Sequence, residues 1–354
     1  MPHPAHVSDS APGARSAAPP PTSPPSGSSG PVCLVVNARS GKGGAGQARD
    51  AVQQACNAAG RGLQVFAIDE RHPADAQARA AVAAAQASTG VVAVAGGDGT
   101  INTAAQATLG SGCAFGVLPQ GTFNYFARNH GIPTTLEGAL EVLMTAAPQP
   151  VQVGLVNERV FLVNASLGIY AQLLEDREAF KSRYGRNRLV ALGAALSTLV
   201  SQHRPWNLDL QWGGERHALR TASLFVGNNA LQFEQVGVAE GEALGGGELV
   251  AVAVRPMGRL ARVGLLLRGA MSRLDDAEAV ETMSFRALTV APVAGALRRR
   301  VKVAADGEVS WMQMPLRFRV APEPLWLIKP AAAAAPGEPL ADARTTAPAS
   351  SNAT

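Results

Sequence analysis

Between residues 31 and 150, short apolar runs alternate with longer amphipathic stretches. Each apolar run is five or six residues long and stops at glycine or polar residues, as buried strands do. Strands are predicted at Val32–Asn37, Leu63–Ile68, Val91–Ala95 and Ala114–Leu118. Helices are predicted at Gln47–Ala59, Ala74–Ala87, Ile101–Leu109, Tyr125–His130 and Leu136–Thr145. Strands that alternate with helices predict an α/β domain, in which a parallel sheet is covered on both faces.

Near Pro148 the pattern changes to short strands separated by Gly, Asn and Asp turns. These strands are predicted at Val151–Val156, Arg159–Ser166, Asn207–Gln211, Arg216–Leu219, Ala222–Val226, Leu249–Val254, Thr282–Val290, Arg300–Ala304, Val309–Met312, Leu316–Val320 and Leu325–Ile328. Further helices are predicted at Tyr170–Lys181, Arg188–Ser201 and Arg259–Met271. Such a pattern is typical of a mainly antiparallel β-sandwich decorated by helices.

The chain is therefore expected to divide into an α/β domain at 31–150 and a sandwich domain at 151–330, whose last strand is able to return to the first domain. The two ends, 1–30 and 331–354, are rich in Pro, Ser and Ala and lack apolar runs. Because they cannot bury enough surface to offset chain entropy, both are predicted to be disordered tails.

Composition and charge argue against several classes of protein. The 354 residues are 47% hydrophobic and carry a formal net charge of +4, which is too mild to favour nucleic-acid binding in general. The three cysteines, Cys33, Cys56 and Cys113, are widely spaced in apolar contexts, which indicates buried thiols in a reducing compartment. The most apolar internal segment, Leu189–Val200, is much shorter than the roughly 20 residues of a membrane span. These observations predict a cytoplasmic protein without a transmembrane segment.

One predicted strand runs directly into a glycine-rich loop. Val91–Ala95 is followed by Gly96–Gly99, and Thr100 stands where the N-cap of the next helix is expected. Strand, glycine loop and helix N-terminus together favour phosphate binding, since backbone N–H groups and the helix dipole face the anion. A carboxylate within the loop, Asp98, would repel a bare phosphate. It therefore suggests a bridging Mg²⁺ or a proton to be removed from an attacking hydroxyl.

Two more polar loops follow predicted strands, at 37–44 and 119–124. The first is glycine-rich and basic but lacks the Walker A spacing; Arg39 and Lys42 are candidates for phosphate binding, or the loop is simply solvated. All three loops follow the carboxyl ends of strands, which is the edge where open α/β sheets bind ligands.

A third candidate feature lies near the C-terminal end of the sandwich. Asp306-Gly307 predicts a two-residue hairpin, which places the carboxylate of Glu308 at the start of a strand. By itself this pattern is equally typical of a polar hairpin tip. The densest basic cluster of the chain, Arg298–Arg300 with Lys302, lies just upstream.

Four motifs in one order resemble the diacylglycerol kinase catalytic family, in its bacterial lipid-kinase branch, over nearly all of residues 32–330. The motifs are Asn37-Ala38-Arg39-Ser40-Gly41 for the family's Asn-Pro-x-Ser-Gly, Gly96–Asn102 for Gly-Gly-Asp-Gly-Thr-x-Asn, Leu118–Asn124 for Leu-Pro-x-Gly-Thr-x-Asn, and Asp306-Gly307-Glu308 for Asp-Gly-Glu. Asn164–Gly168 is similar to the segment that opens the family's second domain. The glycine motif alone is also shared by sphingosine kinases and NAD kinases.

The resemblance implies an ATP-dependent kinase that phosphorylates a hydroxyl of diacylglycerol, a sphingoid base or a similar lipid. It implies that Glu308 takes the proton from this hydroxyl, and that Asp98 supports it or helps to hold Mg²⁺. The residues implied to bind ATP are Asn37, Arg39, Ser40, Gly41, Gly96, Gly97, Asp98, Gly99, Thr100, Ile101, Asn102 and Thr122, with substrate contacts at Gly121 and Asn124. Arg128 is a further candidate for neutralising phosphate charge.

The sequence departs from the family's pattern at three places. Ala38 replaces a proline, and Tyr125 replaces the aspartate that usually follows the third motif. An acidic pair of the second domain is replaced by Gly245-Gly246, so that a structural Mg²⁺ site built on that pair is absent or altered. These changes motivate one alternative, a regulator that binds nucleotide or lipid without catalysis, although Asp98 and Glu308 are retained.

A second alternative is an NAD kinase-like enzyme with a soluble acceptor, which the third and fourth motifs fit less well. The lipid kinase reading implies a role in lipid metabolism, such as phospholipid biosynthesis, and peripheral contact with the inner face of the membrane. The basic cluster is the candidate for this contact. The identity of the lipid and the presence of a homodimer are left open.

Overall fold

The computed structural model describes residues 25, 30–37, 44–168, 205–228, 247–256, 280–293 and 300–331. Several predictions fall outside these ranges. They are the helices at 170–181, 188–201 and 259–271, most of both predicted tails, the first-loop residues Arg39, Ser40, Gly41 and Lys42, the pair Gly245-Gly246, and the basic residues Arg298 and Arg299.

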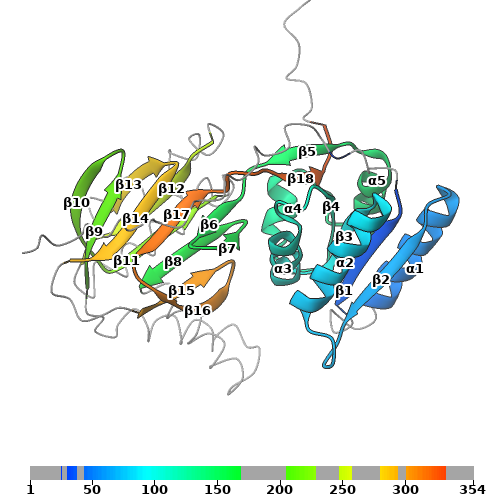
Figure 1. Cartoon of the computed structure of the whole chain (residues 1–354), viewed down its shortest axis with the longest axis horizontal. Coiled ribbons are helices and arrows are strands. Elements are labelled where there is room, and N and C mark those ends of the chain that lie inside the picture. Colours follow the sequence, from blue (N-terminus) through cyan, green and yellow to red (C-terminus); the bar gives the residue numbers. More distant parts are fainter. Residues whose placement is uncertain are drawn as a thin grey trace, which may run out of the picture.

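The first domain is a six-stranded sheet with helices on both faces, at the right of Figure 1. In spatial order its strands are β2 (Leu63–Ile68), β1 (Val32–Asn37), β3 (Val91–Gly96), β4 (Ala114–Pro119), β18 (Leu325–Ile328) and β5 (Pro148–Val151). The helices are α1 (Gly44–Ala58), α2 (Ala74–Ser88), α3 (Asp98–Thr108), α4 (Tyr125–Asn129) and α5 (Leu136–Thr145). Strands β1 to β4 are mutually parallel, which confirms the predicted α/β fold.

The winding of this sheet decides where its loops meet. The chain steps from β1 to β2 in one direction and from β2 across β1 to β3 in the other. Because such crossovers are right-handed, α1 and α5 cover one face while α2 and α3 cover the other. Strands β1 and β3 are therefore neighbours whose following helices lie on opposite faces, and ligands bind at such a point in open α/β sheets.

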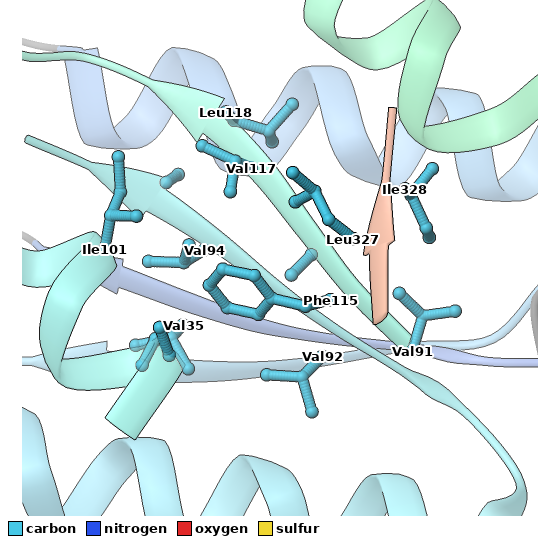
Figure 2. Packing of buried hydrophobic residues seen from close by; sticks show 14 of the residues in the cluster. Val35, Val91, Val92, Val94, Ile101, Phe115, Val117, Leu118, Leu327 and Ile328 are labelled. Atoms are coloured by element: carbon cyan, nitrogen blue, oxygen red, sulfur yellow. The ribbon is translucent and has the colours of Figure 1, made fainter. Parts of the chain in front are cut away.

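Strand β18 completes the first sheet from the far end of the described chain. It pairs in parallel with β4, with Leu327 opposite Phe115, and antiparallel with β5. Figure 2 shows Leu327 and Ile328 among the side chains of β4, where all of these residues are buried. The first sheet therefore contains a strand that follows the whole second domain in the sequence.

The second domain is a sandwich of two antiparallel six-stranded sheets, at the left of Figure 1. One sheet has the order β10 (Glu215–Thr221), β9 (Trp206–Trp212), β14 (Ala287–Pro292), β17 (Leu316–Val320), β6 (Gly154–Val156) and β7 (Arg159–Phe161). The other has the order β13 (Val280–Phe285), β12 (Leu249–Val254), β11 (Ser223–Gly227), β8 (Asn164–Gly168), β15 (Arg300–Ala305) and β16 (Glu308–Gln313). Their inner faces bury alternate apolar residues, such as Leu208 and Leu210 from one and Leu224 and Val226 from the other.

Four details of the predicted elements are wrong. The predicted strand Arg159–Ser166 is two strands, β7 and β8, which belong to different sheets. Thr282–Val290 is likewise divided between β13 and β14, and Val151–Val156 between β5 and β6. Helix α3 begins at Asp98 with Gly97 as its N-cap, so Thr100 is already inside the helix.

The two domains are joined by hydrogen bonds and by a shared core. The chain passes between the domains twice, near Val153 and near Ala321. These two segments are hydrogen-bonded to each other, because the N–H of Ala321 donates to the carbonyl of Val153 at 2.8 Å. Helix α3 packs against β7, where the side chain of Gln106 accepts the N–H of Val160 at 2.7 Å. The core of the first domain continues into Leu155, Val160 and Leu162. The sandwich is therefore held against the α3 side of the first domain.

Candidate active site

The end of β1 and the loops after β3 and β4 meet at one edge of the first sheet. Asn37, the last residue of β1, donates from Nδ2 to Oγ1 of Thr100 at 3.5 Å, which links the first loop to the glycine loop. A Cβ on Gly96 would lie 2.8 Å from Cβ of Thr100, so this position requires glycine. The loops after β3 and β4 therefore meet as predicted, whereas residues 38–43 of the first loop lie outside the described residues.

The glycine loop rests directly on the loop after β4. The N–H of Gln120 donates to the carbonyl of Gly96 at 2.8 Å, and a Cβ on Gly121 would lie 3.1 Å from Cα of Gly97. Asn124, at φ 50, closes this second loop: its Oδ1 accepts from the N–H of Gly121 at 2.8 Å, and its Nδ2 donates to the carbonyl of Gly121 at 3.0 Å. Gly121 and Asn124, the two predicted substrate contacts, thus form the turn that supports the glycine loop.

Asp98 presents a buried carboxylate oxygen that has no hydrogen-bond partner. Its Oδ2 accepts from the N–H of Asn124 at 3.1 Å, whereas its Oδ1 is enclosed and unpaired. Burial raises the pKa of the Asp98 carboxyl above its usual range, and backbone N–H groups, chiefly that of Asn124, oppose this shift. An unpaired buried oxygen is costly unless a ligand satisfies it. The orphaned oxygen therefore fits a cation such as Mg²⁺.

The surroundings of Asp98 fit a metal that is shared with phosphate. No side chain caps the N-terminus of α3, which leaves the positive end of the helix dipole for an anion. Within the described ranges, no group of three or more His, Cys, Asp and Glu side chains could hold a metal ion by itself. Mg²⁺ is commonly held by one or two carboxylates together with substrate phosphates, and the donor set of Asp98 alone matches that chemistry.

The carboxylate of Glu308 comes from the sandwich domain and lies beside the glycine loop. The β15–β16 hairpin turns at Asp306 (φ 47) and Gly307 (φ 87), which confirms the predicted two-residue turn. Oε1 of Glu308 lies 3.4 Å from the position that a Cβ on Gly99 would occupy. Its Oε2 forms a 2.7 Å ion pair with Nη2 of Arg159 on β7. The Glu308 side chain is 58% exposed, so a ligand at the glycine loop can reach it.

The other predicted residues differ in what they can offer a ligand. Thr122 is exposed in the loop after β4, and Arg128 is exposed on α4. Ile101 buries its side chain in the core, as Figure 2 shows, which leaves only its backbone for binding. Tyr125 stacks on the exposed ring of Phe123, with 5.5 Å between centroids.

Asn102, the last residue of the glycine motif, turns its side chain towards the sandwich domain. Its Nδ2 donates to Oδ2 of Asp306 at 2.7 Å and to the carbonyl of Val160 at 3.1 Å. Sequence reasoning assigned no contact to Asp306 and did not single out Arg159. The contacts of Asn102 with Asp306 and of Arg159 with Glu308 each join segments that are far apart in the chain, so the local sequence gives no sign of them.

The comparisons with known proteins agree with this geometry. Residues 31–156 match the family model described as the diacylglycerol kinase catalytic domain. The chain is 37% identical over 94 residues to the "Probable lipid kinase YegS-like" of Klebsiella pneumoniae (strain 342), covering 25% of this chain and 32% of that protein. It is 31% identical over 139 residues to the protein of the same name from Cronobacter sakazakii (strain ATCC BAA-894), covering 35% and 46%. These matches span less than half of each relative's length.

Two crystal structures of proteins from Bacillus anthracis str. Sterne share the fold. One, described as a diacylglycerol kinase, has a TM-score of 0.58 at 17% identity and covers 85% of this chain and 97% of its own. The other has a TM-score of 0.63 at 20% identity and covers 85% and 98%. Such coverage includes the α/β domain and the sandwich together. Residues 31–156 thus match the model of the diacylglycerol kinase catalytic domain, in a chain that has the two-domain fold of these structures.

Proposed function

We propose that the protein is an ATP-dependent lipid kinase, which transfers the γ-phosphoryl group of ATP to a hydroxyl of diacylglycerol, a sphingoid base or a similar lipid. The observation that carries this proposal is the position of Glu308, a carboxylate from the second domain that lies beside Gly99. Transfer to a hydroxyl requires an anion site for the donor and a base for the acceptor. The N-terminus of α3 and the carboxylate of Glu308 are candidates for these two roles.

Each described residue then has a distinct task. The backbone of Gly96–Gly99 and the N-terminus of α3 bind and orient the phosphates of ATP. Asp98 would hold Mg²⁺, which neutralises phosphate charge when bound. Glu308 accepts the proton of the lipid hydroxyl as the new O–P bond forms, and the electron pair of the broken bond leaves with ADP. Arg159 holds the Glu308 carboxylate in place through their 2.7 Å ion pair.

An exposed aromatic residue near Glu308 supports a membrane-bound substrate. Trp311, on the edge strand β16, is 57% exposed, and the side chains of Arg300 and Lys302 lie over its ring, 5.7 and 5.3 Å from the centroid. A ring flanked by cations suits the headgroup region of an anionic bilayer. In the parts of the chain that the structure describes, no helix is long and apolar enough to cross a bilayer. We propose that Trp311, Arg300 and Lys302 hold the enzyme at the membrane surface.

Sedimentation with vesicles tests this contact. Each basic side chain near anionic lipid contributes on the order of 1 kcal/mol, and salt screens that attraction. Binding to phosphatidylserine-containing vesicles should weaken as salt rises and should fall in Trp311→Ala. Val65→Ala, which removes an exposed apolar side chain of the first domain, is the matched control and should bind normally. Salt-independent binding, or unchanged binding of Trp311→Ala, would contradict the proposal.

The activity itself is tested by transfer of radiolabelled phosphate from ATP to a panel of extracted lipids, with NAD as a soluble acceptor in parallel. We expect a labelled lipid product with wild-type protein and little with Glu308→Gln. Labelled NADP would support the NAD kinase-like alternative. ATP binding without transfer to any acceptor would support a regulator that lacks catalysis.

A further inference from the structure

The carboxylate of Asp306 is bonded at the same time to the segment that joins β7 to β8 and to α3. Its Oδ1 accepts the N–H groups of Val163 and Asn164 at 2.9 and 3.0 Å. Its Oδ2 accepts the N–H of Leu162 and Nδ2 of Asn102, both at 2.7 Å. Every one of these donors is an amide, and burial raises the pKa of this carboxyl while the four donors oppose the shift. The carboxylate is thus held by hydrogen bonds from four uncharged amide groups.

The bond between Asn102 and Asp306 connects the two elements that carry the proposed catalytic carboxylates. Asn102 lies four residues after Asp98 on α3, so the two share one face of the helix. Asp306 precedes Glu308 by two residues and forms the turn of its hairpin. Because Glu308 follows this turn directly, a displaced turn would also displace the Glu308 carboxylate from its place beside Gly99.

We propose that Asn102 and Asp306 are a positioning pair, which fixes the hairpin of Glu308 against the helix of Asp98. This inference rests on the proposed function, and it gives Asn102 a role between the domains instead of contact with ATP. Neither residue touches the reacting atoms. Their effect acts through Glu308, because displacement of a catalytic group by about 1 Å costs on the order of 10²-fold in rate.

Helix α3 offers a matched control for this pair. Gln106 also makes two hydrogen bonds to the sandwich domain, from Oε1 to the N–H of Val160 at 2.7 Å and from Nε2 to the carbonyl of Glu158 at 3.3 Å. Among the described residues, Gln106 makes no hydrogen bond to the hairpin that carries Glu308. Asn102→Ala and Gln106→Ala therefore weaken the same junction, but only the first releases the turn at Asp306.

The kinetic test compares these two variants. Asn102→Ala should lower kcat by about 10- to 100-fold with ATP affinity within about twofold of wild type, because position and not ATP binding is lost. Gln106→Ala should keep kcat within about threefold. Equal losses of kcat in both variants would overturn the inference. So would an Asn102→Ala variant that loses ATP affinity while its kcat is unchanged, since Asn102 would then serve the nucleotide.

A second measurement does not depend on activity. In a double-mutant cycle of chemical denaturation, Asn102→Ala and Asp306→Asn should give non-additive shifts of the unfolding midpoint, whereas Gln106→Ala and Asp306→Asn should add. Hydrogen exchange of Leu162, Val163 and Asn164 should speed up in Asp306→Asn and stay slow in Asn102→Ala. Additive shifts for the first pair would overturn the contact. If the wild-type protein lacked kinase activity but the first pair still gave non-additive shifts, the proposed function would be refuted and the contact would stand.

Discussion

At the scale of single residues, the site depends on two glycines whose backbones touch. Gly97 has an ordinary extended backbone, and a Cβ there would meet Cα of Gly121 at 3.5 Å, which is normal contact. A Cβ on Gly121 would instead lie 2.8 Å from Oδ1 of Asn124. The first glycine leaves space next to the proposed phosphate site, whereas the second is needed for the turn itself.

These two positions should respond differently to substitution. Gly97→Val should abolish ATP binding and leave the fold intact, because its branched side chain occupies the space where phosphate approaches. Gly121→Ala should destabilise the protein by about 1–3 kcal/mol, since the added methyl overpacks the turn. Calorimetric titration with Mg·ATP and chemical denaturation measure the two effects. Unchanged ATP affinity in Gly97→Val would reject this loop as the phosphate site.

His130 supplies a pH-dependent contribution to stability. It ends α4 with its ring edge-on to Phe126, 4.7 Å between centroids, and burial, with a smaller effect of Lys329, lowers its pKa to about 4. The unfolded chain binds this proton near pH 6.5, so the contribution is complete above that pH and is lost as pH falls towards 4. The free energy of unfolding should fall by up to about 3 kcal/mol over this window.

Urea denaturation at several pH values checks this expectation against His130→Gln, which cannot titrate. The variant should show a shallower fall in stability between pH 6.5 and 4 than the wild-type protein. Parallel pH profiles of the two proteins would mean that His130 is not held neutral by its surroundings.

At the scale of elements, local patterns predict strands and helices well where each lies in one layer. The four parallel strands β1 to β4 were expected to within one residue. Strands β1, β3 and β4 are apolar runs buried on both faces, whereas the edge strand β2 is largely exposed or half-buried. The division between β7 and β8 could not be predicted. At this division the carboxylate of Asp306, a residue remote in sequence, accepts the N–H groups of Leu162, Val163 and Asn164. No property of the segment itself reports that contact.

Strand β18 should be essential to the first domain although it follows the sandwich in sequence. Leu327 is fully buried between β4 and β5, so Leu327→Ala should cost about 2–5 kcal/mol through lost burial and the cavity that remains. Val293→Ala, at an exposed position, should change stability by less than about 0.5 kcal/mol. Denaturant unfolding at constant m-value measures both. A loss in Leu327→Ala no larger than that of Val293→Ala would contradict the role of β18.

At the scale of the whole molecule, the proposed site exists only because the two domains pack together. The glycine motif and the Asp-Gly-Glu motif could each be read from the sequence, as could the loops at the edge of the sheet. Their contacts could not. Glu308 beside Gly99 and Asn102 on Asp306 depend on how the sandwich sits against α3, and the ion pair of Arg159 with Glu308 joins the two sheets of the sandwich. The shared core through Leu155 and Val160 makes that arrangement a property of the folded chain.

The most direct test of the account is the turnover of Glu308→Gln beside that of Asp98→Asn. The amide of Glu308→Gln keeps the shape of the side chain but cannot accept the hydroxyl proton as a base. General-base catalysis is worth about 10²–10⁴-fold, so kcat should fall by that order while ATP affinity stays close to wild type. Asp98→Asn should lose turnover with a changed dependence on Mg²⁺. Near-normal turnover in Glu308→Gln, with turnover lost in Asp98→Asn, would contradict the account and assign the base to Asp98.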